Sequence, residues 1–294
     1  MSIKKTFYSL VSLFIFGAFI FIGITIFTPE HVARAALSKR VFLTSGTSWT
    51  VPADWSDVNT IETIGGGGTG GTNSGGGGGA YASITNLDLT AGNSVSYQIG
   101  SAGSDTVFNS TATTCAGSPT PSVCADGGVI GVSSTNGTGG TTANSIGTIE
   151  YAGGNGSDGS GGGAAGPNGA GVVADANGGG TGDAGFGGAG GVAGTYEAEI
   201  LTCVNQGDNG SPGTEYSTTP VYGSGGGGGY GPASCTSGTG GSFGAGGGGS
   251  PAKAGGGGLI VITYTSTDTG STSLAKFKIK GGSFLIRGGS VRIR

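Results

Sequence analysis

The sequence predicts an all-β protein, a small antiparallel β-sandwich with a long glycine-rich insertion. One observation is a series of short segments within residues 41–108 that are rich in β-branched and aromatic residues and separated by turn residues. A second is the apolar run at residues 259–264, which is too short for a helix and typical of a strand buried on both faces. Because such a strand needs partners, we expect it to pair with the first strands, giving one domain over residues 41–264.

The expected strands share a composition that favours extended backbone. The first three contain Val, Ile, Thr, Phe and Trp, residues that pack well on a pleated sheet. The other two alternate apolar with polar side chains, as half-buried strands do, and residues 90–93 form a turn between them. In chain order the expected strands are residues 41–44, 49–51, 59–64, 81–87 and 94–99.

Glycine supplies 72 of the 294 residues, where about 7% is the usual share. Residues 110–258 form the expected insertion, which has no strict Gly-X-Y period and is therefore not collagen. Two states remain open for it: disorder, or a bundle of left-handed polyglycine II helices whose backbone N–H and C=O groups bond laterally. The cysteines and scattered aromatic residues of this region, such as Tyr230 and Phe243, favour the ordered bundle.

An apolar run near the amino terminus predicts export. Lys4 and Lys5 precede the uncharged residues 7–27, which are long enough to span a membrane as a helix. A small-x-small triplet ending at Ala35 fits a signal-peptidase cleavage site after that residue. Residues 1–36 are therefore either a cleaved signal peptide or a transmembrane signal anchor. Both place the rest of the chain in the cell envelope or outside the cell.

Four cysteines form an even set, and in an exported chain disulfides are the expected state. Three pairings exist, and we favour the local one, which joins Cys115 to Cys124 and Cys203 to Cys235. A zinc site is the alternative, but the spacing contains no Cys-x-x-Cys and no histidine lies nearby.

Charge is divided between an acidic body and a basic tail. Residues 41–275 contain fifteen acidic residues and one base, Lys253, whereas residues 276–294 contain six bases and no acid. The tail follows a polar linker, residues 265–275, and repeats with a period of seven: an apolar residue, any residue, Ile, a base and Gly-Gly-Ser. Alternation within each unit predicts three short strands with glycine turns between them.

The basic residues of this tail suggest a docking function. They would attract an anionic polymer of the cell envelope, such as a glycan, a phosphate polymer or lipid headgroups. A solvated basic tail without a partner is the alternative. The candidate docking residues are Lys276, Lys278, Lys280, Arg287, Arg292 and Arg294.

The residues needed for most catalysis are missing. His31 is the only histidine and is lost if the signal peptide is cleaved, so the exported body has none for a Ser-His-Asp triad or a metal site. The pairs Asp54 with Asp57 and Glu197 with Glu199 fit solvated surface groups better than acid–base catalysts. We expect no enzymatic activity, no cofactor and no metal, and the acidic body argues against nucleic acid as a partner.

Four blocks of sequence, in order, carry a resemblance to a known family. They are TSWTVPADW at residues 47–55, NTIETIGGGG at 59–68, GAYA at 79–82 and GLIVITY at 258–264. Over residues 41–264 the chain resembles the bacterial and phage glycine-rich domain found in tail-fibre-like and surface proteins. The resemblance implies a structural or recognition role at a surface without enzymatic activity, and polyglycine II packing like that of phage adhesin tips. Phage tail proteins are assembled in the cytoplasm, so the export segment favours a cell-surface protein.

The predicted function is recognition or adhesion by an exported cell-surface protein. In this hypothesis loops at the ends of the glycine-rich bundle form the contact surface, and a surface glycan is one expected partner. The alternative is a structural subunit of the envelope or of an appendage, docked through its basic tail. Membrane contact through an uncleaved N-terminal segment and self-association are compatible with both hypotheses.

Overall fold

The computed structural model describes residues 37–197, 202–232, 235–267, 276–279 and 282–285. Its regular elements are β-strands and two single-turn 3₁₀ helices, η1 (Thr142–Asn144) and η2 (Asp183–Gly185). The all-β class is therefore confirmed for these residues. The N-terminal segment at residues 1–36, with its expected helix, lies outside them. Within the described ranges no helix has the length and hydropathy needed to cross a bilayer.

Five antiparallel strands form the larger sheet, which contains the first and the last strand of the domain. The last strand lies between the first and the third, because Val261 is paired with Phe42 on one side and with Glu62 on the other. This arrangement confirms the expected pairing of residues 259–264 with the first strands. Across the sheet the order is β1 (Ser38–Leu43), β13 (Leu259–Thr265), β3 (Asn59–Ile64), β4 (Tyr81–Thr85) and β8 (Ile149–Tyr151).

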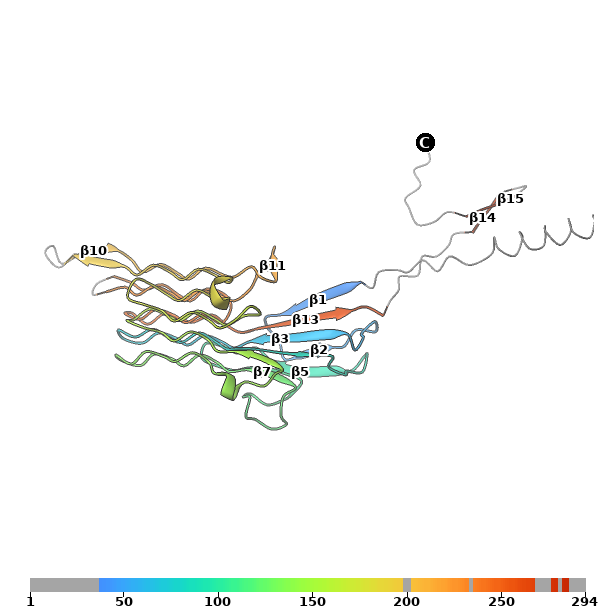
Figure 1. Ribbon diagram of the computed structural model, residues 1–294, viewed down its shortest axis with the longest axis horizontal. Coiled ribbons are helices and arrows are strands. Elements are labelled where there is room, and N and C mark those ends of the chain that lie inside the picture. The colour runs from blue at the N-terminus through green and yellow to red at the C-terminus, as the bar shows by residue number, and fades with distance from the viewer. Residues whose placement is uncertain (1–36, 198–201, 233–234, 268–275, 280–281, 286–294) are drawn as a thin grey trace, which may run out of the picture. The chain divides into compact units, whose positions relative to one another are not determined.

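A second antiparallel sheet shares a hydrophobic core with the first. Ile61, Ile260 and Ile262 enter this core from the larger sheet, and Val95 and Phe108 enter it from the smaller one. Burial of each such side chain contributes roughly 1.5–3 kcal/mol, so the core holds the two layers together (Figure 1). The smaller sheet has the order β2 (Ser48–Thr50), β5 (Ser94–Gln98), β6 (Thr106–Phe108) and β7 (Val123–Ala125).

Three two-stranded pairs complete the set of described strands. They are β9 (Thr195–Glu197) with β10 (Thr202–Asn205), β11 (Ser217–Thr218) with β12 (Val221–Tyr222), and β14 (Lys276–Ile279) with β15 (Gly282–Leu285). The ring of Tyr222 stacks on that of Phe42, with 4.2 Å between centroids. Phe42 belongs to a second cluster, with Val261, on the face of the larger sheet turned away from the smaller sheet. The β11–β12 hairpin therefore covers part of that face.

Strands and glycine-rich segments are interleaved along the chain. β7 and β8 lie within residues 110–258, which the sequence predicts to be a single insertion, and residues 65–80 between β3 and β4 already belong to the glycine-rich part. The chain thus leaves the sheets and returns to them several times. Each excursion adds glycine-rich segments that run side by side (Figure 1).

Backbone hydrogen bonds link the glycine-rich segments laterally, with a period of three residues. Gly76 donates to Gly247 at 2.9 Å and Gly79 donates to Gly244 at 2.6 Å, so both contact the same neighbouring segment. Gly77, between them, donates to Val129 of a different segment at 3.0 Å. Backbone groups that would otherwise be buried without partners are satisfied in this way by several neighbours.

Four segments lie at the centre of this network: residues 75–79, 161–165, 225–229 and 244–248. Each exchanges backbone hydrogen bonds with six neighbouring segments, and each consists only of Gly and Ala. For residues 75–79 the six partners are residues 65–68, 126–129, 137–140, 154, 162–165 and 244–247. Lateral bonding on all sides satisfies the buried backbone without side-chain packing.

Glycine is required in these segments because the neighbouring backbones approach too closely for a side chain. A Cβ atom at Gly76 would lie 2.0 Å from the carbonyl oxygen of Gly68, and one at Gly227 would lie 1.8 Å from that of Gly161. Non-bonded heavy atoms prefer separations of about 3.5–4.0 Å, so a methyl group would push the segments apart. Neither Gly76 nor Gly227 has a positive φ, so close approach alone accounts for the choice of residue.

We predict that Gly227→Ala lowers the free energy of unfolding by roughly 2–4 kcal/mol, because overpacking of a closely packed interior is costly. For a domain of this size the corresponding fall in Tm is roughly 5–15 °C. The matched control is Gly257→Ala, whose new Cβ would have its nearest neighbour at 3.5 Å. We expect its Tm to change by less than about 3 °C. Equal Tm values for the two variants in thermal unfolding would contradict the close-approach argument.

Candidate functional site

Turns from distant parts of the chain meet at the end of the glycine-rich segments that points away from the two sheets. The N–H of Gly249 donates to the carbonyl of Gly159 at 2.8 Å. The hydroxyl of Tyr230 donates to Asn73 Oδ1 at 3.1 Å, across a sequence separation of 157 residues. These hydrogen bonds fix the turns relative to one another.

We call this surface the turn end, and Figure 1 shows it around β10. It consists of residues 71–74, 132–135, 157–160, 175–178, 230–232 and 249–252 together with the β9–β10 hairpin. Its exposed side chains are mostly small and polar or acidic. They include Thr72, Asn73, Ser133, Ser134, Asp158, Asp175 and Asn177.

The turn at Asp158 and Gly159 illustrates how local sequence shapes this surface. Both residues have positive φ, 47° and 83°, as in a two-residue type I′ turn, for which Asp-Gly is a preferred pair. Gly159 also faces the ring of Tyr230, where a Cβ would lie only 2.3 Å from a ring carbon. The turn therefore presents the exposed Asp158 side chain beside a tyrosine that comes from a remote segment.

Two disulfides are present, and they join the pairs that the sequence favours. Cys115 is bonded to Cys124, and Cys203 of β10 is bonded to Cys235. The second bond ties the β9–β10 hairpin to the segment that follows Tyr230, so it lies within the structure that supports the turn end. Structural disulfides of this kind are typical of proteins in oxidising compartments.

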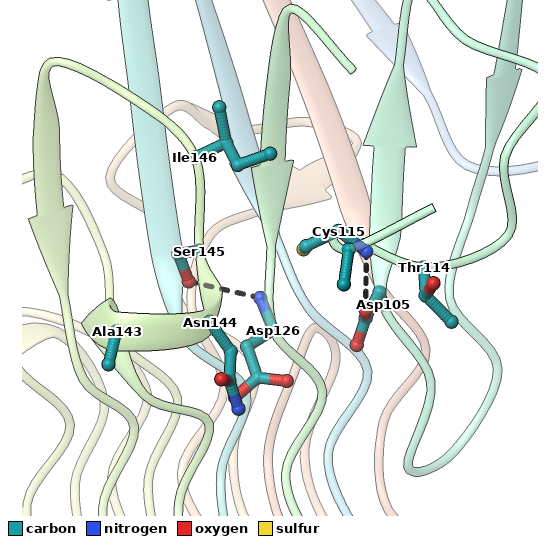
Figure 2. Close-up of a pocket in the computed structure, with 9 residues that line it drawn as sticks. Asp105, Thr114, Cys115, Asp126, Ala143, Asn144, Ser145 and Ile146 are labelled. Atoms are coloured by element: carbon teal, nitrogen blue, oxygen red, sulfur yellow. Dashed lines mark hydrogen bonds between the residues drawn. The ribbon is translucent and has the colours of Figure 1, made fainter. Parts of the chain in front are cut away.

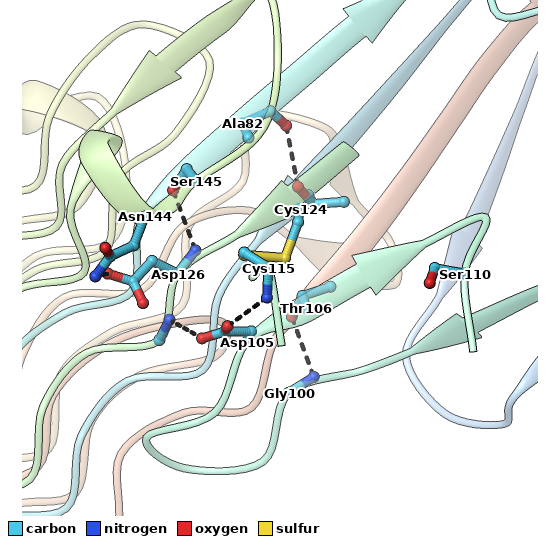
Figure 3. Close-up of a disulfide and its surroundings, with 12 residues drawn as sticks. Ala82, Gly100, Asp105, Thr106, Ser110, Cys115, Cys124, Asp126, Asn144 and Ser145 are labelled. Carbon is cyan, nitrogen blue, oxygen red and sulfur yellow. Dashed lines mark hydrogen bonds between the residues drawn. A yellow bond between two sulfur atoms is a disulfide. The ribbon is translucent and has the colours of Figure 1, made fainter. Parts of the chain in front are cut away.

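A hollow of about 550 Å³ lies beside the first disulfide, lined by Asp105 and Asp126 among others (Figure 2). Asp105 accepts hydrogen bonds from the backbone N–H groups of Cys115 and Gly127, both at 2.9 Å (Figure 3). Asp126 accepts from the N–H and hydroxyl of Thr141 at 2.8 and 3.1 Å. Asp105 directly precedes β6 and Asp126 directly follows β7. Both carboxylates thus hold neighbouring loops to the ends of these strands, which is a structural role.

Metal ligation by this group is ruled out by the sulfur chemistry. Asp105, Cys115 and Cys124 are the one group of three or more potential ligands that come close together in the described part of the chain. Because the two sulfurs share a disulfide, neither is the thiolate that a metal such as zinc requires.

A buried carboxyl group lies on the face of the larger sheet that is turned away from the smaller sheet. Glu62, in the middle of β3, is 9% exposed and accepts hydrogen bonds at Oε1 from the hydroxyls of Tyr81 at 2.8 Å and Tyr216 at 2.9 Å. Burial raises the pKa of Glu62 above its ordinary value, although the two tyrosines and Arg40 oppose this shift. Glu62 is not among the residues singled out from the sequence; its signal is an acid in the middle of an expected strand. The group joins β3, β4 and the segment before β11.

Of the carboxylates considered as pairs from the sequence, the structure describes Asp54, Asp57 and Glu197. Asp54 forms an ion pair with Lys39 at 2.6 Å, and hydrogen bonds from Lys39 and Ser266 lower its pKa to about 2. Asp57 and Glu197 are exposed, and Glu199 lies outside the described residues.

The candidate docking residues of the tail are described only in part. Lys276 and Lys278 belong to β14, whereas Lys280, Arg287, Arg292 and Arg294 lie outside the described residues, as does Ala35. β14 begins one residue before the first unit of the seven-residue repeat and otherwise lies within it, and β15 runs from the end of that unit into the second. The two strands pair in antiparallel register.

No model of a protein family matches the chain, and no curated protein matches it in sequence.

We predict that Glu62→Gln makes the protein more stable at neutral pH and flattens the dependence of its stability on pH above about pH 4.5. The pKa of Glu62 is raised from its ordinary value of 4.5, so the stability it contributes is full below pH 4.5 and is lost as the pH rises through the raised pKa. Glutamine keeps an acceptor for both tyrosines without the buried charge. Urea unfolding at several pH values measures the effect, with the exposed Asp57→Asn as control. If the unfolding free energies of Glu62→Gln and wild type changed in parallel with pH, the raised pKa of Glu62 would be refuted.

Proposed function

We propose that this is an exported cell-surface protein that acts in recognition or adhesion, with the turn end as its contact surface. The observation that supports this is the convergence of turns from distant segments at one end of the domain, where hydrogen bonds hold them in place. Loops on a rigid scaffold are the usual carriers of binding residues. The two disulfides agree with the oxidising environment that such a protein would meet.

The proposal includes a finer description of the fold, a β-sandwich that carries a bundle of polyglycine II helices. Hydrogen bonds that return to the same neighbour at every third residue support three residues per turn. The six neighbours of each central segment support a bundle rather than a sheet, since a strand within a sheet has two. A bundle bonded through its backbone is a stiff support, and stiffness lowers the ordering cost when a ligand binds.

A non-catalytic role is part of the same proposal. The carboxylates with described partners act as ties: Asp105 to the backbone of two loops, Glu62 to two tyrosines and Asp54 to Lys39. Each of these groups is engaged in hydrogen bonds or an ion pair within the fold. We infer that binding rather than turnover is the activity to look for.

An alternative is a structural subunit of the envelope, docked through the basic tail. The observation that favours it is the β14–β15 hairpin, in which Phe277 is paired with Phe284 at equivalent positions of two repeat units. Because strands from adjacent repeat units pair with each other, further units could add strands to the same small sheet. Its bases would bring it to anionic polymers by attraction that salt screens.

We predict that bulky substitutions at the turn end abolish binding without unfolding the protein. The double variant Thr72→Arg/Ser134→Arg changes two exposed turn residues and should weaken attachment of the full-length protein to cells by at least about tenfold. The control is Thr90→Arg, in the exposed turn between β4 and β5 at the other end of the domain. Attachment is counted by flow cytometry, and Tm is compared among the three proteins. Unchanged attachment of the double variant would refute the turn end as the contact surface.

For the alternative, we predict that Lys276→Gln/Lys278→Gln/Lys280→Gln releases the protein from the envelope fraction at low salt. The expected fraction released exceeds that of the wild type at low salt and approaches that of the wild type washed in about 1 M salt, where the Debye length is about 3 Å. Lys253→Gln, which removes a base from the body, is the control. Retention of the triple variant at low salt would show that the bases of this hairpin do not dock the chain.

A further inference from the structure

Two exposed amide side chains, Gln206 and Asn209, are held in the same way by two threonines. The N–H and the hydroxyl of Thr236 both donate to Gln206 Oε1, the hydroxyl at 2.6 Å. The N–H and the hydroxyl of Thr239 donate to Asn209 Oδ1 at 2.8 and 3.0 Å. We call these four residues the amide ladder.

We call each amide with its threonine a rung of the amide ladder. Beside each rung a backbone hydrogen bond is donated in the opposite direction, toward the threonine. Gly207, after Gln206, donates to the carbonyl of Thr236 at 2.8 Å, and Gly210, after Asn209, donates to that of Thr239 at 2.9 Å. Each amide oxygen thus accepts two hydrogen bonds from one threonine, and the backbone N–H of the following glycine adds a third bond between the two segments. The rungs lie three residues apart on both segments, which is one turn, about 9 Å, in the polyglycine II geometry proposed above.

A covalent bond fixes the end of the ladder nearest the turn end. Cys203 precedes Gln206 by three residues, Cys235 directly precedes Thr236, and the two cysteines are joined in a disulfide. The two segments therefore cannot separate at that end while the disulfide is intact. The ladder is a rigid feature of the surface although all four of its side chains belong to exposed residues.

The ladder leaves its hydrogen-bond donors free to meet a ligand. The oxygen of each amide is engaged, but among the described residues neither Gln206 Nε2 nor Asn209 Nδ2 has a hydrogen-bond partner. Each amide nitrogen carries two N–H donors. The side-chain entropy that binding normally costs has already been lost in the clamp, which favours affinity.

We propose that the amide ladder binds an uncharged polysaccharide laid along it. The amide N–H groups can donate to the hydroxyl and ether oxygens of sugars, and the threonine oxygens can accept from sugar hydroxyls. A one-turn spacing suits a ligand that repeats. The exposed acid Asp208 lies between the two amides in sequence and disfavours an anionic polymer. The proposal rests on the recognition role proposed above, to which it adds a second contact surface and a ligand class.

The test uses a double variant that keeps the clamp and removes the donors. In Gln206→Glu/Asn209→Asp each carboxylate still accepts from its threonine, but a second oxygen replaces the NH₂ group. Full-length wild type and variant are measured for retention on beads bearing dextran, mannan, galactan or, as an anionic comparison, polygalacturonate. The matched control is Asn155→Asp, where an exposed amide likewise accepts a backbone hydrogen bond, from Gly139 at 2.8 Å, away from the ladder.

We expect wild type and Asn155→Asp to be retained on at least one neutral polysaccharide, and the double variant to bind at least about tenfold more weakly with an unchanged Tm. Equal retention of the double variant, or no retention of the wild type on any neutral bead, overturns the ladder proposal. A fall in Tm without loss of retention would show that the ladder only holds the segments together. Attachment to cells by the turn end is measured separately, so failure here and failure of the recognition role can be told apart.

Discussion

The close lateral approach of glycine-rich backbones is the constraint on which the rest of this structure depends. At Gly76 and Gly227 a neighbouring carbonyl oxygen occupies the space that a Cβ atom would need. The same proximity allows hydrogen bonds between segments at intervals of three residues. Stability in this half of the domain comes from satisfied backbone groups, since the central segments contribute almost no side chains. A single methyl group at the centre is therefore costly, whereas the periphery accepts side chains.

This division between centre and periphery determines what the surface can display. In residues 135–141, Thr135, Thr138 and Thr141 are exposed, whereas the glycines between them are buried. Side chains thus leave the bundle at every third position and are held at fixed spacings by the backbone beneath them. The turn end and the amide ladder both depend on this support: one gathers turns from remote segments, the other aligns two amides with two threonines.

Much of the sheet structure could be predicted because it follows from local pattern. The run at residues 259–264 has the composition of a central strand, and it lies between β1 and β3 as expected. The local disulfide pairing also agrees. The contacts of Glu62 could not be predicted, because Tyr216 reaches it across 154 residues. The strands β6, β7 and β8 are not among the expected strands, because each is only three residues long.

The sequence by itself determined the all-β class, the division into an acidic body and a basic tail, and the positions where the chain has no side chain. Only the tertiary structure decided which glycine runs lie at the centre. Residues 225–229 and 255–258 are both pure glycine, yet the first is bonded on six sides and the second contains the exposed Gly257. The physical reason is that glycine permits close approach without specifying a neighbour. The neighbours are set by the points at which the chain returns to the sheets.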